Sequence, residues 1–245
     1  MQRLSLTGRA LNILFAEDNE LNRFLFTRQL TPFEDKIIFA ENGQQAVEII
    51  KSQPVDIVFM DIRMPVMNGY DATIAIRALE VPLCSIPIIA ITAADSEEDF
   101  GKCIEAGMND LISKPFETEE LIKKINKWLL EEKTTHESKR NNAQVLPPTD
   151  PDYKKKMLNI FLRQKEEFVS QIKLAISEKN HDSLSFILHK MKSSFNVLSI
   201  ESLNEKLNAL EVAAQGNNYP LMSEKADALF AALDDTENSL RKNNS

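Results

Sequence analysis

The chain has 245 residues, of which 43% are hydrophobic, and a formal net charge of −8. This length and composition allow two modest domains, each with its own buried core. Apolar stretches fall short of the roughly 18 to 20 residues of a membrane span, and the N-terminus lacks a signal-peptide core, so we expect a soluble, cytoplasmic chain. Cys84 and Cys103 show no metal-ligand spacing and are expected to be reduced, partly buried thiols.

The charge is distributed unevenly along the chain. Residues 1–132 hold 13 basic and 22 acidic side chains, a net of −9, whereas residues 133–152 hold three of each. Residues 153–245 hold 13 basic and 12 acidic side chains, a net of +1. A DNA-binding output domain presents a basic face, and no recognition-helix pattern is visible. Direct nucleic-acid binding is therefore disfavoured.

In the first 132 residues, short apolar runs alternate with periodic segments of helical length. This alternation is typical of successive βα units on a parallel sheet, and we expect five strands and five helices. Helix starts are indicated at Asn19, at Asn42-Gly43, near Ser96 and at Thr118.

Polar side chains follow four of the strand-like runs. They are Glu17 and Asp18 after residues 13–16, Asp61 after 55–60, Thr92 after 88–91, and Lys114 after 111–113. In a flavodoxin-like strand order the first and third strands are neighbours, so the three carboxylates converge at the carboxyl edge of the sheet.

A carboxylate at this edge is placed to act as a nucleophile toward a phosphoryl group, and we assign that role to Asp61. Because Glu17 and Asp18 add negative charge, the cluster implies a divalent cation, and Mg²⁺ favours such oxygen ligands. Thr92 is expected to donate its hydroxyl to the phosphoryl oxygens, and Lys114 to place an ammonium on another oxygen.

These residues resemble the receiver domain of two-component response regulators, over about residues 9–132. The motifs that carry the resemblance are Phe15 to Asn19, Asp61 with Met64-Pro65 and Asn68-Gly69, Ile91 to Ala93, and Lys114 to Phe116. The resemblance implies that Asp18 is a direct Mg²⁺ ligand, that Glu17 acts mainly through water, and that the backbone carbonyl of Arg63 completes the set with Asp61. It also implies a cis Lys114-Pro115 peptide.

Residues 133–152 lose periodicity and collect polar residues and prolines, which indicates a linker. From residue 153 to 243 the pattern is entirely helical, and we expect four principal helices. The breaks are indicated near Asn180, Leu198-Ser199 and residues 216–220.

The second of these helices carries an apolar stripe at helical spacing. Its members are Leu184, Ile187, Leu188, Met191, Phe195 and Leu198. At about 100° per residue His189 points away from the stripe, beside Ser185, Lys192, Ser193 and Asn196. We therefore expect a histidine that faces solvent on a polar face. His136 and His181 lack such a setting and are interpreted as solvated residues.

Residues 188–194 resemble the His-x-x-Lys segment of histidine phosphotransfer (HPt) domains, which are four-helix bundles with a phosphorylatable histidine. Ser193 stands where that family usually has Gly. By this resemblance His189 is the nucleophile and Lys192 neutralises phosphoryl oxygens. The expected fold is thus an α/β flavodoxin-like receiver followed by an all-α HPt domain.

The resulting hypothesis is a phosphorelay, in which a histidine kinase donates to Asp61 and His189 passes the phosphoryl group to a downstream response regulator receiver. The domain order resembles the C-terminal part of an unorthodox hybrid histidine kinase. Gly totals only six and no glycine-rich ATP-binding boxes are visible, so phosphotransfer is the only activity expected. The sequence leaves open a fragment of a membrane sensor or a separate relay protein, and transfer within or between chains.

An alternative is a non-catalytic module, in which a receiver-like domain and a helical domain regulate a sensor kinase by binding alone. Loss of an essential site residue would favour it. Asp18, Asp61, Thr92 and Lys114 are all present, which favours phosphate chemistry.

Overall fold

The computed structural model describes most of the chain as two compact units, one before and one after residues 131–150. The described residues are 9–31, 33, 35–92, 97–130, 151–198 and 200–243. Each unit is described by itself.

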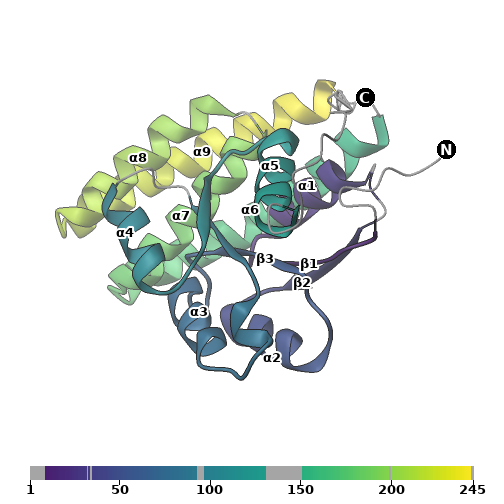
Figure 1. Ribbon diagram of the computed structural model, residues 1–245. Helices are drawn as coiled ribbons and strands as arrows, with labels where there is room; N and C mark the ends of the chain where they lie inside the picture. The colour runs from purple at the N-terminus through teal and green to yellow at the C-terminus, as the bar shows by residue number, and fades with distance from the viewer. Residues whose placement is uncertain are drawn as a thin grey trace. The chain divides into compact units, whose positions relative to one another are not determined.

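The first unit contains a sheet of five parallel strands in the order β2-β1-β3-β4-β5 (Figure 1). The strands are β1 (Asn12–Ala16), β2 (Lys36–Ala40), β3 (Ile57–Asp61), β4 (Ile88–Thr92) and β5 (Asp110–Ser113). The expected flavodoxin-like order is confirmed, because β1 and β3 are neighbours. Strands β3 and β4 are buried along their whole length, as expected of central strands with both faces covered.

Five α-helices connect or follow these strands. They are α1 (Glu20–Leu30), α2 (Gly43–Ser52), α3 (Gly69–Arg77), α4 (Glu97–Glu105) and α5 (Thr118–Leu130), with a 3-10 turn at Leu83–Ser85. Two predicted starts are confirmed as caps, because the side chains of Asn19 and Asn42 accept hydrogen bonds from Leu21 N and Gln45 N. The start predicted at Thr118 is also confirmed, whereas Ser96 lies outside the described residues.

Two apolar layers enclose the sheet. Helices α1 and α5 cover one face (Figure 1), where the Phe15 and Phe26 rings stack with centroids 3.8 Å apart. Helices α2 and α3 cover the other face, where Ala46 and Ile76 belong to the same apolar cluster as Leu14. Because both faces are covered, the sheet is held rigid and its carboxyl edge has a fixed geometry.

The second unit consists, over its described residues, of four helices. They are α6 (Pro151–Ser177), α7 (His181–Leu198), α8 (Glu201–Gln215) and α9 (Tyr219–Asn243). The expected linker, residues 133–152, lies almost wholly outside the described residues. Its last two residues, Pro151 and Asp152, belong to α6, because proline suits the first turn of a helix.

All four helices contribute to one apolar core. The predicted stripe of α7 is buried, except that Leu198 is only partly buried against this core. The break predicted over residues 216–220 is shorter than expected, since Tyr219 and Pro220 begin α9. Proline is again accepted in a first turn, where its missing N–H costs no hydrogen bond.

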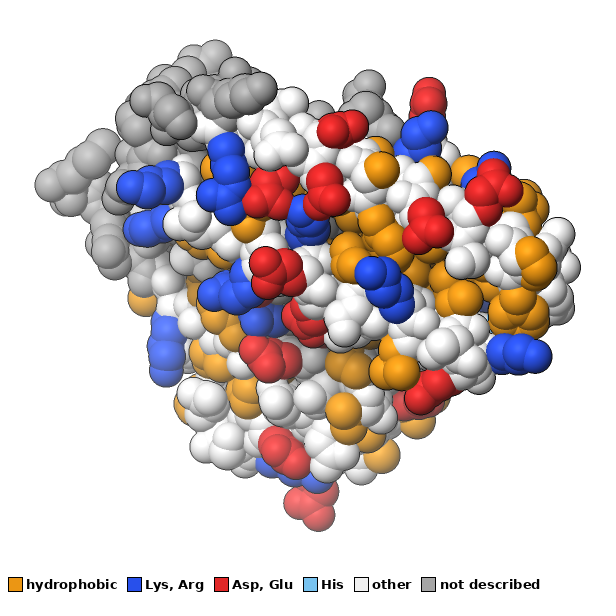
Figure 2. Space-filling view, turned by 180° about the vertical axis from the view of Figure 1, so that it is seen from behind, with side chains coloured by type: hydrophobic (Ala, Val, Ile, Leu, Met, Phe, Trp, Pro, Cys, Tyr) orange, Lys and Arg blue, Asp and Glu red, His pale blue; other side chains and the backbone are white. Residues whose placement is uncertain are grey.

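The described surface carries charges of both signs. On the face shown in Figure 2, acidic and basic side chains are interspersed. Among the described helices none combines the length and the apolar character that a bilayer crossing requires.

Candidate functional site

Strand register brings the first acidic residues to the acceptor. In the β1–β3 pair, Ala16 is level with Met60, so Glu17 is level with Asp61. Both side chains are buried, with Glu17 at 1% and Asp61 at 3% exposure. Two carboxylates from separate strands therefore share one edge of the sheet.

Strand register also brings the predicted residues Thr92 and Lys114 to the edge of the sheet where Asp61 lies. In the β3–β4 pair Asp61 is level with Ile91, which places Thr92 one residue further along. In the β4–β5 pair Thr92 is level with Ser113, and the backbone N–H of Lys114 donates to the Thr92 carbonyl at 2.7 Å. The peptide between Lys114 and Pro115 is cis, as the resemblance implied.

The acidic cluster has a donor set that suits a hard divalent cation. One carboxylate oxygen from each of Glu17, Asp18 and Asp61 lies within 4.8 Å of the others. Asp18 is partly exposed, whereas its two neighbours are buried. Oxygen-only ligands of this kind fit Mg²⁺.

Lys114 lies between two of these carboxylates. Its Nζ donates to Glu17 Oε2 at 2.7 Å and to Asp61 Oδ2 at 2.8 Å. Burial alone would lower the pKa of Lys114, but the two carboxylates outweigh burial and the pKa is raised. The lysine is therefore a permanent positive charge in the site. The sequence placed Lys114 here but did not predict that it bridges Glu17 and Asp61.

The pKa values of Asp61 and Glu17 are both raised. Burial is the main cause in each case, and the contact with Lys114 opposes it. The charge of Asp18 raises the pKa of Asp61 further. One ammonium thus offsets only part of the repulsion among three carboxyl groups, so the cluster gains from an additional positive charge.

Asn19, the N-cap of α1, and residues within α1 fix Glu17, and the sequence analysis did not predict these contacts. Glu17 Oε1 accepts from the backbone N–H of Asn19 at 3.1 Å, and the Glu17 carbonyl accepts from Arg23 Nη1 at 2.8 Å. A hydrogen bond from the buried Asn22 side chain opposes the rise in the Glu17 pKa. The available signal was the polar side chains of Asn19, Asn22 and Arg23 shortly after the acidic pair.

The backbone after Asp61 folds back tightly over the acceptor. The Gly69 N–H donates to the Ile62 carbonyl at 2.9 Å, and a Cβ built on Gly69 would lie 2.3 Å from the Asp61 carbonyl oxygen. Only glycine fits this approach. The Arg63 N–H lies 3.4 Å from Asp61 Oδ1, so this loop also contacts the acceptor carboxylate.

In the second unit, α7 carries the predicted histidine and lysine. His189 is partly exposed, and Lys192 follows it by three residues. Ser193 was expected on the same exposed face, but it is buried. The reason is that four residues rotate Ser193 by about 40° from His189, toward the partly buried Phe186 and Val197.

Lys192 has partners on α8 that the sequence reasoning did not identify. Its Nζ lies 3.2 Å from Asn208 Oδ1 and 3.5 Å from Glu211 Oε2. The sequence held a signal for this contact, because Asn208 and Glu211 are three residues apart and therefore share one face of α8.

The interpretation of His181 as a solvated residue is wrong. Its Nε2 lies 2.6 Å from the Tyr219 hydroxyl, and the contact is partly buried. His181 begins α7 and Tyr219 begins α9, so this contact joins the starts of two helices. No pattern in the sequence near His181 indicated it. His136 lies outside the described residues. Both cysteines are free thiols, as expected, with Cys84 partly buried and Cys103 buried.

Within the first unit, residues 13–126 match the family model of the response regulator receiver domain, so this segment is a receiver domain. Relatives with a similar segment include hybrid signal transduction histidine kinases of Dictyostelium discoideum.

Two curated relatives illustrate the similarity. The hybrid signal transduction protein dokA of Dictyostelium discoideum is 39% identical over 117 residues, which cover 48% of this chain and 7% of dokA. The sensor histidine kinase GacS of Pseudomonas protegens is 27% identical over 254 residues, which cover 96% of this chain and 27% of GacS. The chain thus spans little more than a quarter of the length of GacS and far less of dokA.

The chain is also similar to a solved structure. The receiver domain of the sensor histidine kinase PA1611 from Pseudomonas aeruginosa PAO1, which has a magnesium ion in its active-site cleft, is 37% identical. The match covers 49% of this chain and 98% of that one, with a TM-score of 0.46.

Proposed function

We propose that this chain is a phosphorelay module. Asp61 accepts a phosphoryl group from the phosphohistidine of a histidine kinase, and His189 passes it to a downstream response regulator. The observation that carries this proposal is the meeting of the Glu17, Asp18 and Asp61 carboxylates beside the Lys114 ammonium.

Mg²⁺ is the cofactor of the first transfer. Asp18 and Asp61 would hold it directly, Glu17 through water, and the Arg63 backbone carbonyl would complete the set. When bound, the cation neutralises the cluster and the phosphoryl oxygens. The support for this assignment is the oxygen-only donor set within 4.8 Å.

In the first transfer, an Asp61 carboxylate oxygen forms the new bond to phosphorus. The nitrogen–phosphorus bond of the donor histidine breaks, and its imidazole takes up a proton from solvent. Lys114 keeps its charge, because its pKa is raised, and neutralises a phosphoryl oxygen. The buried Thr92, next to Lys114 across the strand pair, supplies a hydroxyl donor.

In the second transfer, a ring nitrogen of His189 attacks the aspartyl phosphate, the oxygen–phosphorus bond breaks, and the ring proton passes to solvent. Lys192 supplies a countercharge one turn away. Three features support an HPt role: four helices around one core, a partly exposed His189, and a GacS alignment that covers 96% of this chain. The positioning groups for this step come from the docked receiver.

The chain would act in the cytoplasm, between a histidine kinase and a response regulator. Because the chain spans only 27% of GacS, the histidine kinase activity that GacS is named for is not part of this proposal.

The test is to incubate the full chain with Mg²⁺ and a small phosphodonor, and to map base-labile and acid-labile phosphate by mass spectrometry. We expect a base-labile phosphate on Asp61 and an acid-labile one on His189. Asp61→Asn should remove the first label, and His189→Gln should remove only the second. A folded wild-type chain that takes up neither label would support the alternative of a module that acts by binding alone.

A further inference from the structure

Helices α7 and α8 run antiparallel with a defined register. Asn204 Nδ2 donates to Asn196 Oδ1 at 3.2 Å, and Lys192 Nζ donates to Asn208 Oδ1 at 3.2 Å. A step of four residues back along α7 is therefore matched by a step of four forward along α8. One further step of three residues brings His189 level with Glu211.

The polar residues along the contact between α7 and α8 lie on one side of each helix. On α7 they are His189, Lys192 and Asn196, and on α8 they are Asn204, Asn208 and Glu211. Spacings of three and four residues keep side chains on a common helical face. Glu211 thus belongs to the same row of polar groups as the proposed phosphohistidine.

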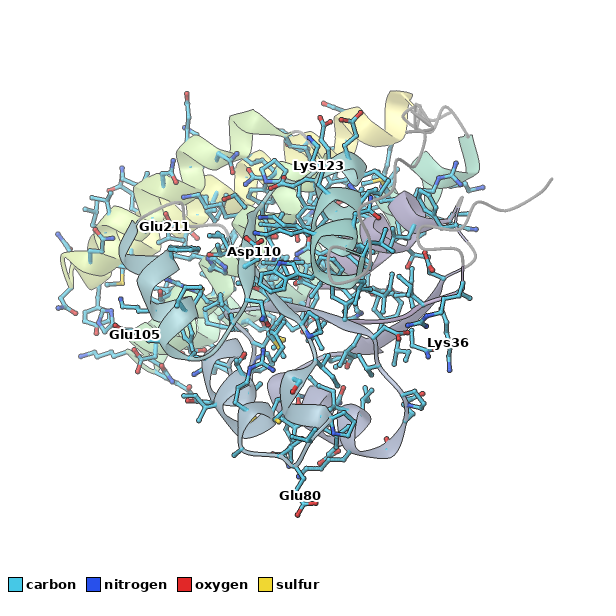
Figure 3. All side chains as sticks on the ribbon, viewed as in Figure 1. Lys36, Glu80, Glu105, Asp110, Lys123 and Glu211 are labelled. Carbon is cyan, nitrogen blue, oxygen red and sulfur yellow. The ribbon has the colours of Figure 1, made fainter. Side chains whose placement is uncertain are left out.

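Glu211 forms an ion pair with Lys192 in this row. Its Oε2 lies 3.5 Å from Lys192 Nζ, and the side chains are 29% and 39% exposed, respectively. Glu211 is labelled in Figure 3. The pair is shielded on part of its surface, so solvent and salt screen it incompletely.

We propose that Glu211 is a positioning residue of the His189 site, an inference that rests on the proposed function. Glu211 holds the Lys192 ammonium level with His189 while the histidine is unmodified. A phosphoryl group on His189 then competes with Glu211 for the same ammonium, and the two anions repel each other. Glu211 therefore lowers the share of phosphoryl groups on His189 and favours their onward transfer.

The first test measures the ion pair itself. Glu211→Gln removes the charge and keeps the shape, and Glu205→Gln makes the same change at an exposed position of α8. An amine-reactive reagent, with its adduct on Lys192 quantified by mass spectrometry, reports how strongly that ammonium is held. We expect modification about two- to five-fold faster in Glu211→Gln, the size expected for a partly exposed pair, and no change in Glu205→Gln.

The second test measures the phosphoryl distribution in the full chain with Mg²⁺ and a small phosphodonor. The ratio of acid-labile phosphate on His189 to base-labile phosphate on Asp61 should rise about two- to five-fold in Glu211→Gln. In a Lys192→Gln background the same substitution should have a smaller effect, because the competition for the ammonium is gone.

Two outcomes separate this inference from the proposed function. If wild-type protein never carries phosphate on His189, the proposed function is overturned and the inference falls with it. If wild-type protein is labelled on His189, but Glu211→Gln changes the ratio no more than Glu205→Gln does, the inference alone is overturned.

Discussion

The ammonium of Lys114 lies 2.8 Å from the Asp61 carboxylate and 2.7 Å from that of Glu17, so one buried cation holds two buried anions. This arrangement is stable only while all three groups are present. Removing the lysine leaves two buried carboxylates without their countercharge, with Asp18 beside them.

We therefore predict that Lys114→Met lowers the free energy of unfolding at pH 7 by about 3 to 5 kcal/mol, the cost of breaking a buried ion pair. The pKa values of Asp61 and Glu17 are already raised by burial, and they rise further without the lysine. A folded state that binds protons more tightly than the unfolded state gains stability as the pH falls.

The variant should hence recover part of its stability as the pH is lowered from 7 toward 5, or when Mg²⁺ is added. Urea denaturation at each condition measures this, with Lys51→Met, at an exposed position of α2, as the control. An equal loss of stability at both pH values, with or without Mg²⁺, would contradict the electrostatic explanation.

Asp18→Ala should weaken Mg²⁺ binding and slow phosphorylation of Asp61 together. Asp18 contributes one of the three clustered carboxylates. Loss of a residue that only supports a metal ligand typically costs about 10- to 100-fold in metal affinity, and we expect Asp18→Ala to cost at least as much. Calorimetric titration measures the affinity, and Glu48→Ala, on the exposed side of α2, is the control. An unchanged titration would exclude Asp18 as a ligand.

Gly69→Ala should damage the acceptor loop, because its Cβ would lie 2.3 Å from the Asp61 carbonyl oxygen. We expect a loss of about 1 to 3 kcal/mol, typical of overpacking, with slower phosphorylation of Asp61. Gly101→Ala is the matched control, since nothing lies within 4 Å of its added Cβ. Within α4 that change should be neutral or stabilise by up to about 1 kcal/mol. Similar unfolding curves for both variants would show that the close approach relaxes freely.

Asp110 links β5 to α5, and its removal should make the receiver less stable. The carboxylate accepts from Lys124 Nζ at 2.6 Å, Lys127 Nζ at 2.8 Å and Trp128 Nε1 at 3.0 Å. Asp110 is labelled in Figure 3. We expect Asp110→Asn to cost about 1 to 3 kcal/mol, with little of it from Lys127, whose side chain is half exposed.

The same network gives a pH dependence. Burial acts to raise the pKa of Asp110, but the three side-chain donors and the backbone N–H of Leu111 outweigh burial and hold the pKa well below its ordinary value of 3.8. Its contribution is therefore complete above pH 3.8 and is lost as the pH falls below that value. Denaturation curves of wild type and Asp110→Asn should converge in acid. A constant difference between them down to pH 2 would contradict this assignment.

Much of the receiver followed from local patterns. The caps at Asn19 and Asn42 and the strand ending at Asp61 were predictable, because capping and apolar runs depend on neighbours in the chain. That Glu17 and Asp61 meet at the carboxyl edge of the sheet was predictable from one further assumption, the flavodoxin-like strand order.

Tertiary structure alone decided which charged groups meet. Lys114 contacts Glu17 across 97 residues of chain, and Lys192 contacts Glu211 from a different helix. The burial of Ser193 likewise removed one residue from the expected polar face. Such contacts depend on strand register and on the rotation of packed helices, which are set by the fit of whole apolar cores. The sequence determined the chemical groups and the elements that carry them, whereas packing determined their partners.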